Sequence, residues 1–508
     1  MEQANPAQPR GGSFDRFLNR FVSGGLRPYL WLGLLFFACA LLQPLTGLLS
    51  AREIQIYLAL LVGGALAWGG CALYYRRLTY RQAVCLIVLL GLLMRLGYVM
   101  YSPAQLRQHD FYDSNGHLSY IMNFVNGGGL PDSNEWQYYH PPLHHFIFSL
   151  FVRFFHLLGR TETTALCESL QYISGFYSAA MMVVAWRFLC ISGIGRRATL
   201  AAMAVFCLHP TFYVMGGSMN NDDLMLLLFF SSLLYLLRWY QNPGWKNSLL
   251  LGVCIGCAMM AKTSAALLAP VAVVVFLIKL CQLWRQRGGL RGVLPIVGRL
   301  AAFGAVSLPL GLWYPIRNLI AFGQPLGYVA KIGEDAAIYC GRVPLLYRLL
   351  PFVSDAWQGQ LYCDPFEDYN IAAYLARCSV FGESGYQGVD VQAALLLSAN
   401  VCLILISLAA MIYVLLRQRG EKTFAVRLIM ALTWATQVGS HLIMNLQYPY
   451  GCTMDFRYLV PTVLTGAVFL GMAGARLRSK GKLLPYYAIN CFIALFCLAG
   501  IWMYLFAA

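Results

Sequence analysis

The sequence QAVCLIVLLGLLMRLGYVMY, residues 82–101, is followed after a short gap by HDFYDSNGHLSYIMNFVNGGGLPDSNEWQYYHPP, residues 109–142. The first stretch is long and apolar enough to cross a hydrocarbon core of about 30 Å as a helix. The second is polar and carries Asp110, Asp113 and His117 near its start, in a chain of which only 11% is charged. A polar cluster at the end of an apolar helix predicts a site at a membrane surface.

The same apolar pattern recurs along the whole chain, which has 508 residues and is 59% hydrophobic. The apolar runs are continuous rather than alternating, and backbone polar groups in lipid must be satisfied within their own segment, so helices are expected. The predicted fold is therefore an all-α polytopic membrane protein. We predict thirteen transmembrane helices, at residues 28–49, 54–75, 82–101, 168–190, 198–215, 221–240, 247–262, 264–284, 293–314, 396–416, 424–446, 457–475 and 484–506.

Charged residues indicate the orientation of these helices. Lys and Arg fall in every second loop, and their preference for cytoplasmic loops predicts a cytoplasmic N-terminus and an outer C-terminus. The net charge of +16 is explained in this way and does not indicate nucleic acid. Of the 21 carboxylates only Glu2, Asp15 and Glu421 are predicted on the cytoplasmic side. This distribution indicates that the functional surface faces outward. Compact loops without a eukaryotic retention signal favour a bacterial plasma membrane.

The segment LHHFIFSLFVRFFHLL, residues 143–158, is apolar but short and carries three histidines and an arginine. Counting it as a crossing would place Arg196 and Arg197 outside, so we expect an interfacial or re-entrant helix. The predicted organisation is a cytoplasmic tail at 1–27, two additional helices at 28–81, a transmembrane module at 82–314 with a large outer loop at 102–167, an outer loop domain at 315–395 and C-terminal transmembrane helices at 396–508.

The first outer loop contains two candidate catalytic residues, Asp113 and Asp110. A carboxylate at a membrane exit can act as the general base that takes a proton from an acceptor hydroxyl or amine. Asp113 could instead cap the helix expected over 114–126, whereas Asp110 has no evident capping role and could be a solvated loop acid. His117 follows Asp113 by four residues, a spacing that on a helix could hold a substrate or a metal. The candidate ligands for a divalent metal, which the sequence leaves open, are Asp113, His117 and Asp222.

A second polar cluster, SMNNDDLM at 218–225, lies at the outer end of a predicted crossing. A helix cap explains one of its polar residues but hardly all of them. We therefore predict that Asn221, Asp222 and Asp223 belong to the same site as the acids of the first outer loop.

Three cations are predicted at outer helix ends. Lys262 lies between two apolar runs in MMAKTSAALL, and an ionisable residue in such a setting is a functional hypothesis, with snorkelling to the interface as the alternative. Arg317 in WYPIRN and Arg457 in MDFRYLVP suit bidentate phosphate recognition. His140, before two prolines, could contact a phosphate or sit at the headgroup level. These cations and carboxylates together suit a phosphorylated donor and a nucleophilic acceptor.

In this order, the motifs HDFYDSNGH, HPPL, NNDD, AKTS and FRYLVP resemble the GT-C integral-membrane glycosyltransferases. The branch that they resemble contains the protein O-mannosyltransferases and aminoarabinose transferases, and the similarity runs from about residue 82 to the C-terminus. The resemblance implies a GT-C fold and an inverting transfer of a sugar from a polyprenyl-phosphate donor on the outer face. It also implies that an acid of the first outer loop is the general base.

The resemblance also implies roles for individual residues. Asp113 matches the catalytic Asp of the family by its distance to HPPL, but the DE pair common in the family is absent because Ser114 follows. Asp110 therefore remains a second candidate. Substrate-binding roles carry over to the second acidic motif and to the cations, at Asp222, Asp223, Lys262, Arg317, Arg457 and His140.

Two other functions stay open from the sequence. One is an oligosaccharide ligase or polymerase that uses a diphosphate lipid, and metal dependence would favour it. The other is a lipid or sugar transporter, although transporters usually keep ionisable groups near the bilayer midplane rather than at one surface. The expected partners are a polyprenyl-phosphate sugar, an acceptor glycan, lipid or protein, and the lipid bilayer.

Overall fold

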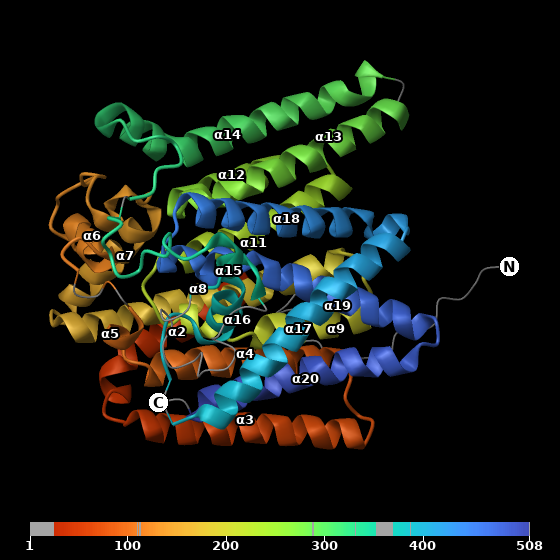
Figure 1. Ribbon diagram of the computed structural model, residues 1–508, viewed down its shortest axis with the longest axis horizontal. Helices are drawn as coiled ribbons and strands as arrows, with labels where there is room; N and C mark the ends of the chain where they lie inside the picture. The colour runs from red at the N-terminus through yellow and green to blue at the C-terminus, as the bar shows by residue number, and fades with distance from the viewer. Residues whose placement is uncertain are drawn as a thin grey trace.

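The computed structural model describes residues 25–108, 110, 113–286, 289–330, 332–351, 369–386 and 388–506. Most of the predicted N-terminal tail therefore lies outside the described residues. Within them the chain is helical, and a single isolated bridge pairs Tyr339 with Tyr450. The predicted all-α fold is confirmed, with long helices packed side by side (Figure 1).

Every predicted crossing is occupied by a long helix or by a pair of consecutive helices. These are α2 (Arg27–Thr46), α3 (Ala51–Tyr74), α4 (Tyr80–Tyr101), α8 (Thr163–Ile191), α9 (Arg196–Leu208) with α10 (Thr211–Met215), α11 (Asp222–Gln241), α12 (Trp245–Ala261), α13 (Leu268–Gln286), α14 (Leu290–Phe322), α17 (Asp390–Arg417), α18 (Phe424–Gln447), α19 (Pro461–Ser479) and α20 (Leu483–Phe506). Ten helical segments of the described chain are long and apolar enough to cross a membrane. Helices α18 and α19 are not among these ten, and neither is α12, which has 17 residues. The prediction of a multi-pass membrane protein is confirmed.

Local sequence signals explain where several helices begin and end. At the start of α3, the Ser50 hydroxyl accepts a hydrogen bond from the Glu53 amide, and the Glu53 carboxylate accepts one from the Ser50 amide at 2.8 Å. The crossing predicted at 198–215 is interrupted, because Pro210 has no amide hydrogen with which to continue α9 beyond Leu208.

Helix α8 lies in the centre of the bundle and α14 at its edge. In the most apolar 18-residue window of each helix, 78% of α8 is buried inside the protein but only 11% of α14. Figure 1 shows α14 as the outermost helix at the top of the bundle. Helices α9 and α19 pack closely, and a Cβ atom on Gly471 would lie 2.4 Å from the Ala198 carbonyl oxygen. Only glycine allows this approach.

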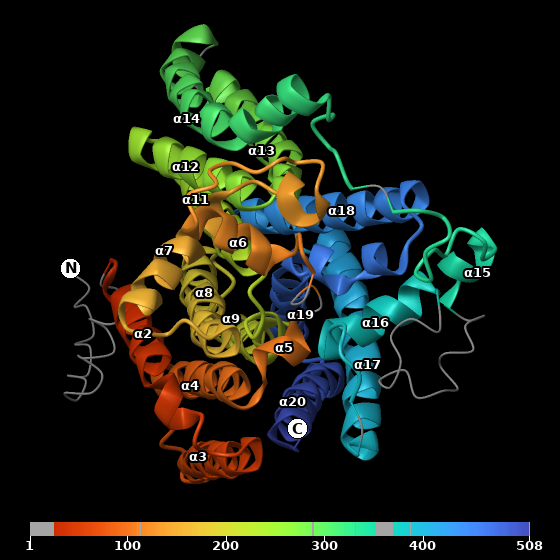
Figure 2. The ribbon, with the colours of Figure 1, turned by 90° about the vertical axis from the view of Figure 1, so that its left-hand side faces the viewer.

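The two large loops meet at one end of the bundle, which we call the site end. The short elements there are α5 (Ala104–Arg107), α6 (His117–Val125), η1 (Trp136–Tyr139), α7 (Leu143–Leu157), η2 (Thr263–Leu267), α15 (Leu345–Leu349), α16 (Ile371–Phe381), η6 (Gly451–Met454) and η7 (Phe456–Tyr458). Seen from this end, α5, α6 and α7 lie across the ends of the long helices (Figure 2). The loops that hold Arg76, Arg196 and Lys422 lie at the opposite end of the bundle.

Candidate active site

A large cavity of about 500 Å³ lies at the site end. Its volume is in the range typical of small-molecule sites. One part of its wall is apolar and comes from α11, η2 and α18, namely Met225, Phe229, Leu267, Ile443 and Met444. The cavity can therefore accept a long apolar group alongside a polar one.

The polar part of this cavity is built around an ion pair. Lys262 Nζ lies 2.6 Å from Asp222 Oδ1, and the two side chains are only 9% and 3% exposed. Lys262 is the residue between α12 and η2, so a break between helices presents its side chain to the N-terminus of α11. Arg457 and His140 also line the cavity, so two cations and a histidine from three segments of the chain come together there.

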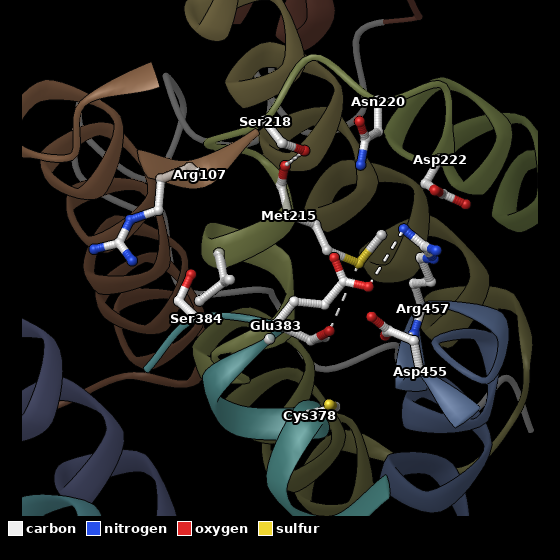
Figure 3. Close-up of a pocket in the computed structure, with 13 residues that line it drawn as sticks. Arg107, Met215, Ser218, Asn220, Asp222, Cys378, Glu383, Ser384, Asp455 and Arg457 are labelled. Carbon is white, nitrogen blue, oxygen red and sulfur yellow. Dashed lines mark hydrogen bonds and ion pairs between the residues drawn. The ribbon is translucent and has the colours of Figure 1, made fainter. Parts of the chain in front are cut away.

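Figure 3 shows the residues that line a second, smaller cavity of about 60 Å³. Asp222 and Arg457 line both cavities. Arg457 Nη1 lies 3.7 Å from Glu383 Oε1, which comes from the turn after α16. The two cavities are thus adjacent, and a charged wall of Asp222 and Arg457 is common to both.

Asp110 is buried between elements of the two cavities. Its Oδ2 atom accepts a hydrogen bond of 2.7 Å from the His117 backbone amide, and His117 lines the large cavity. Its Oδ1 atom accepts a hydrogen bond from the Gln108 side-chain amide, which also donates to Asn220 Oδ1 at 2.6 Å in the wall of the small cavity. A Cβ atom on Gly116 would lie 2.4 Å from the Asp110 carbonyl oxygen, so this close packing requires glycine.

Asp113 lies in a different environment, because it is exposed whereas Asp110 is buried, although neither residue lines either cavity. Helix α6 begins only at His117, so Asp113 and His117 do not share a helix face as the sequence suggested. The alternative reading of Asp113 as the cap of this helix is also wrong. The loop turns back on itself, with the Asp113 amide bonded to the Asp110 carbonyl at 3.2 Å, and Asp110 accepts from the first helical amide.

Buried histidines form a stack beside this loop. The His117 ring is parallel within 9° to the rings of His140 and His145, at centroid distances of 5.8 and 5.2 Å, and its Nδ1 atom lies 2.9 Å from His145 Nε2. Burial lowers the pKa values of these three histidines; the Asp110 carboxylate opposes this at His117, and the Lys262 ammonium adds to it at His140. The stack is therefore expected to be neutral at pH 7.

The metal candidates are not grouped in the structure. Among the described residues, no set of three or more His, Cys, Asp or Glu side chains is placed to hold a metal ion. Asp113 is exposed, His117 is paired with His145, and Asp222 already has the Lys262 ammonium as its cation.

Three other predicted residues lie outside both cavities. The Asn221 side chain donates to the Ala261 carbonyl at 3.0 Å. Asp223 is 1% exposed, and within the described chain neither of its carboxylate oxygens has a hydrogen-bond partner. Arg317 donates to the Pro131 carbonyl at 3.1 Å and stacks on Phe322, so it holds the first loop to α14.

The structure adds residues that sequence reasoning did not assign to the site. Asn220 belongs to the NNDD motif and Asp455 to the MDFRYLVP motif, so both were within motifs already recognised. Gln108 and Glu383 had no local signal, because their roles depend on contacts with distant segments.

Asp455 gives a testable dependence of stability on pH. Burial, together with the nearby Glu383 carboxylate, raises the pKa of Asp455 to about 7. The unfolded value is about 3.9, so the folded state binds the proton more tightly, and stability is lost as the pH rises from about 4 through 7. We expect the melting temperature in detergent to fall more between pH 5 and pH 8 in the wild type than in Asp455→Asn. Parallel curves for the two proteins would contradict this.

Comparison with known families gives a match over part of the chain. A family model described as dolichyl-phosphate-mannose-protein mannosyltransferase matches residues 139–310. This region holds His140, Asp222 and Lys262. The chain resembles GT-C glycosyltransferases. The resemblance predicted from the order of the motifs is thus confirmed, and it supports a glycosyltransferase activity. No curated protein sequence matches the chain significantly.

Several solved structures are similar to the chain at low identity. The Pmt1-Pmt2 protein O-mannosyltransferase complex of S. cerevisiae bound to the sugar donor is 14% identical, over 51% of this chain and 35% of that one, with a TM-score of 0.36. The oligosaccharyltransferase AglB of Archaeoglobus fulgidus, in complex with an inhibitory peptide and a dolichol-phosphate, is 12% identical over 83% and 55%, with a TM-score of 0.45. ArnT of Cupriavidus metallidurans is 13% identical over 82% and 77%, with a TM-score of 0.33. The chain thus spans about a third of the first of these proteins and about half of the second.

Proposed function

We propose that this chain transfers a sugar, with inversion, from a polyprenyl-phosphate donor to an acceptor on the outer face of a bacterial plasma membrane. The observation that carries the proposal is the large cavity, whose lining combines an apolar wall with Lys262 and Arg457. A lipid chain gains free energy when it leaves water for an apolar wall, and a buried phosphate needs cationic partners. One cavity offers both.

The proposed chemistry needs a base and cations, but no strong acid. Phosphate leaves readily from an anomeric carbon, and Lys262 and Arg457 would stabilise the charge that develops on it. We assign the base to Asp110 rather than to Asp113. Asp110 is buried and oriented by two hydrogen bonds, whereas Asp113 is exposed. A single displacement by the acceptor oxygen would invert the anomeric carbon.

The predicted domain organisation fits this proposal. The loop 102–167 supplies Asp110, His117 and His140, and the outer domain 315–395 supplies Glu383. The helices of 396–508 supply Arg457 through the segment between α18 and α19. The site is therefore proposed to need all three parts of the chain.

Donor preference tests the proposal. The purified chain in detergent is given radiolabelled sugars linked to polyprenyl monophosphate or to polyprenyl diphosphate, with chelator in half of the samples. We expect release of label from a monophosphate donor, and equal release with chelator because Lys262 already supplies the cation at Asp222. Consumption of diphosphate donors only, with loss in chelator, would favour a ligase or polymerase. If a folded protein consumed no donor, the proposal would fail and a flux assay for transport would follow.

A further inference from the structure

The small cavity differs in chemistry from the large one. Its wall is mostly polar, with Arg107, Ser218, Asn220, Asp222, Glu383, Ser384, Asp455 and Arg457. Its volume of about 60 Å³ has room for roughly four to six water molecules at 10–15 Å³ each. It therefore suits a small polar group and not a lipid chain.

This cavity lies next to the proposed donor site and near the proposed base. It shares Asp222 and Arg457 with the cavity assigned to the donor, so a group bound in it would lie next to the donor phosphate. Through Asn220 and Gln108 it is also linked by hydrogen bonds to Asp110, the proposed base. The Gln108 amide donates to both side chains, so one hydrogen-bonded residue separates Asn220 in this wall from the proposed base.

The polar groups around this cavity favour one class of nucleophile. The carboxylates of Glu383 and Asp455 accept hydrogen bonds, and Figure 3 shows Glu383 directed toward Arg457, with Asp455 beside them. The Asn220 amide carries both donors and an acceptor. Neighbouring hydroxyl groups of a sugar ring are donors and acceptors at once, and so match this mixture.

Resting on the function proposed above, we propose that the small cavity is the acceptor subsite, and that it binds the sugar hydroxyls of a glycan through Glu383 and Asp455. The acceptor hydroxyl gives its proton to the Asp110 carboxylate, and its oxygen forms a bond to the anomeric carbon. The bond from that carbon to the phosphate oxygen breaks, and the lipid phosphate leaves with the electron pair. The raised pKa of Asp455, about 7, lets this carboxyl donate as well as accept a hydrogen bond near neutral pH.

The fate of the sugar tests this inference. Membranes of the source cell that contain the full chain receive the labelled donor that the wild type consumes. Label is then separated into protease-sensitive protein, glycan and free sugar. We expect label in glycan. Label in protein, or only as free sugar, would overturn the inference, whereas failure to consume any donor would defeat the proposed function itself.

Variants separate acceptor binding from donor use. Glu383→Gln is expected to lower the ratio of transfer to donor hydrolysis at least tenfold, and Ser384→Trp, which fills the cavity, should do the same. Glu334→Gln is the matched control, because Glu334 is an exposed acid of the same outer domain. If both cavity variants kept the wild-type ratio, the small cavity would not be the acceptor subsite.

Discussion

Asp110→Asn is expected to lower sugar transfer about 1000-fold, within the 10²–10⁴-fold range of a general base. The asparagine oxygen can still accept from the His117 amide, so the start of α6 is preserved while the proton acceptor is lost. Because the change removes chemistry rather than ground-state binding, the KM for the donor should stay close to that of the wild type. Transfer of label from the donor, measured at saturating donor, gives the effect directly.

Asp113→Asn is the matched control, since it changes the same side chain three residues later in the same loop. Asp113 is exposed, whereas Asp110 is buried and hydrogen-bonded, so this variant should keep transfer within about threefold of the wild type. The reverse pattern, with an active Asp110→Asn and an inactive Asp113→Asn, would move the base to Asp113 and require the loop to rearrange on substrate binding.

Lys262→Met is expected to reduce both stability and donor binding. The substitution leaves the Asp222 carboxylate buried without the Lys262 ammonium, which lies 2.6 Å away in the wild type. Such a loss lowers the free energy of unfolding by about 3–5 kcal/mol. It also removes one of the two cations assigned to the donor phosphate, so donor binding should become too weak to saturate. Thermal unfolding in detergent and a donor-binding titration measure the two effects separately.

The double variant Lys262→Met/Asp222→Asn separates stability from binding. It removes the unpaired charge, so most of the stability should return while transfer stays low. Lys246→Met is the control for the loss of a lysine, because Lys246 is exposed near the other end of α12. If Lys262→Met were as stable and as active as the wild type, the ion pair would be needed neither for stability nor for donor binding.

The helices of this protein could be predicted from local sequence. Continuous apolar runs define the crossings. The break between α9 and α10 follows from Pro210, because proline has no amide hydrogen. The short helix at 143–158 was distinguished from a crossing by its length and by the charges of the later loops, and α7 (Leu143–Leu157) lies at the site end. Lys262 and Arg457 were predicted from their place at helix ends, and both line the large cavity.

The positions of individual site side chains could not be predicted in the same way. Arg317 has the same local signal as Arg457, a cation at a helix end, yet it holds the first loop to α14 and lines neither cavity. Asp222 and Asp223 are adjacent in the chain, but successive residues of a helix point about 100° apart. One carboxylate therefore meets Lys262, and the other lies inside the bundle.

The sequence by itself determined the membrane class, the helices and the order of the polar motifs, because apolar length and helix ends are local properties of the chain. Only the tertiary structure decided that Asp110, and not Asp113, is buried beside the cavities, since that depends on contacts of Gln108 with Asn220 and of Asp110 with α6. It also decided that Asp222 and Arg457 form a wall common to two cavities. Burial and hydrogen-bond partners arise where distant segments pack, and no short stretch of sequence contains that information.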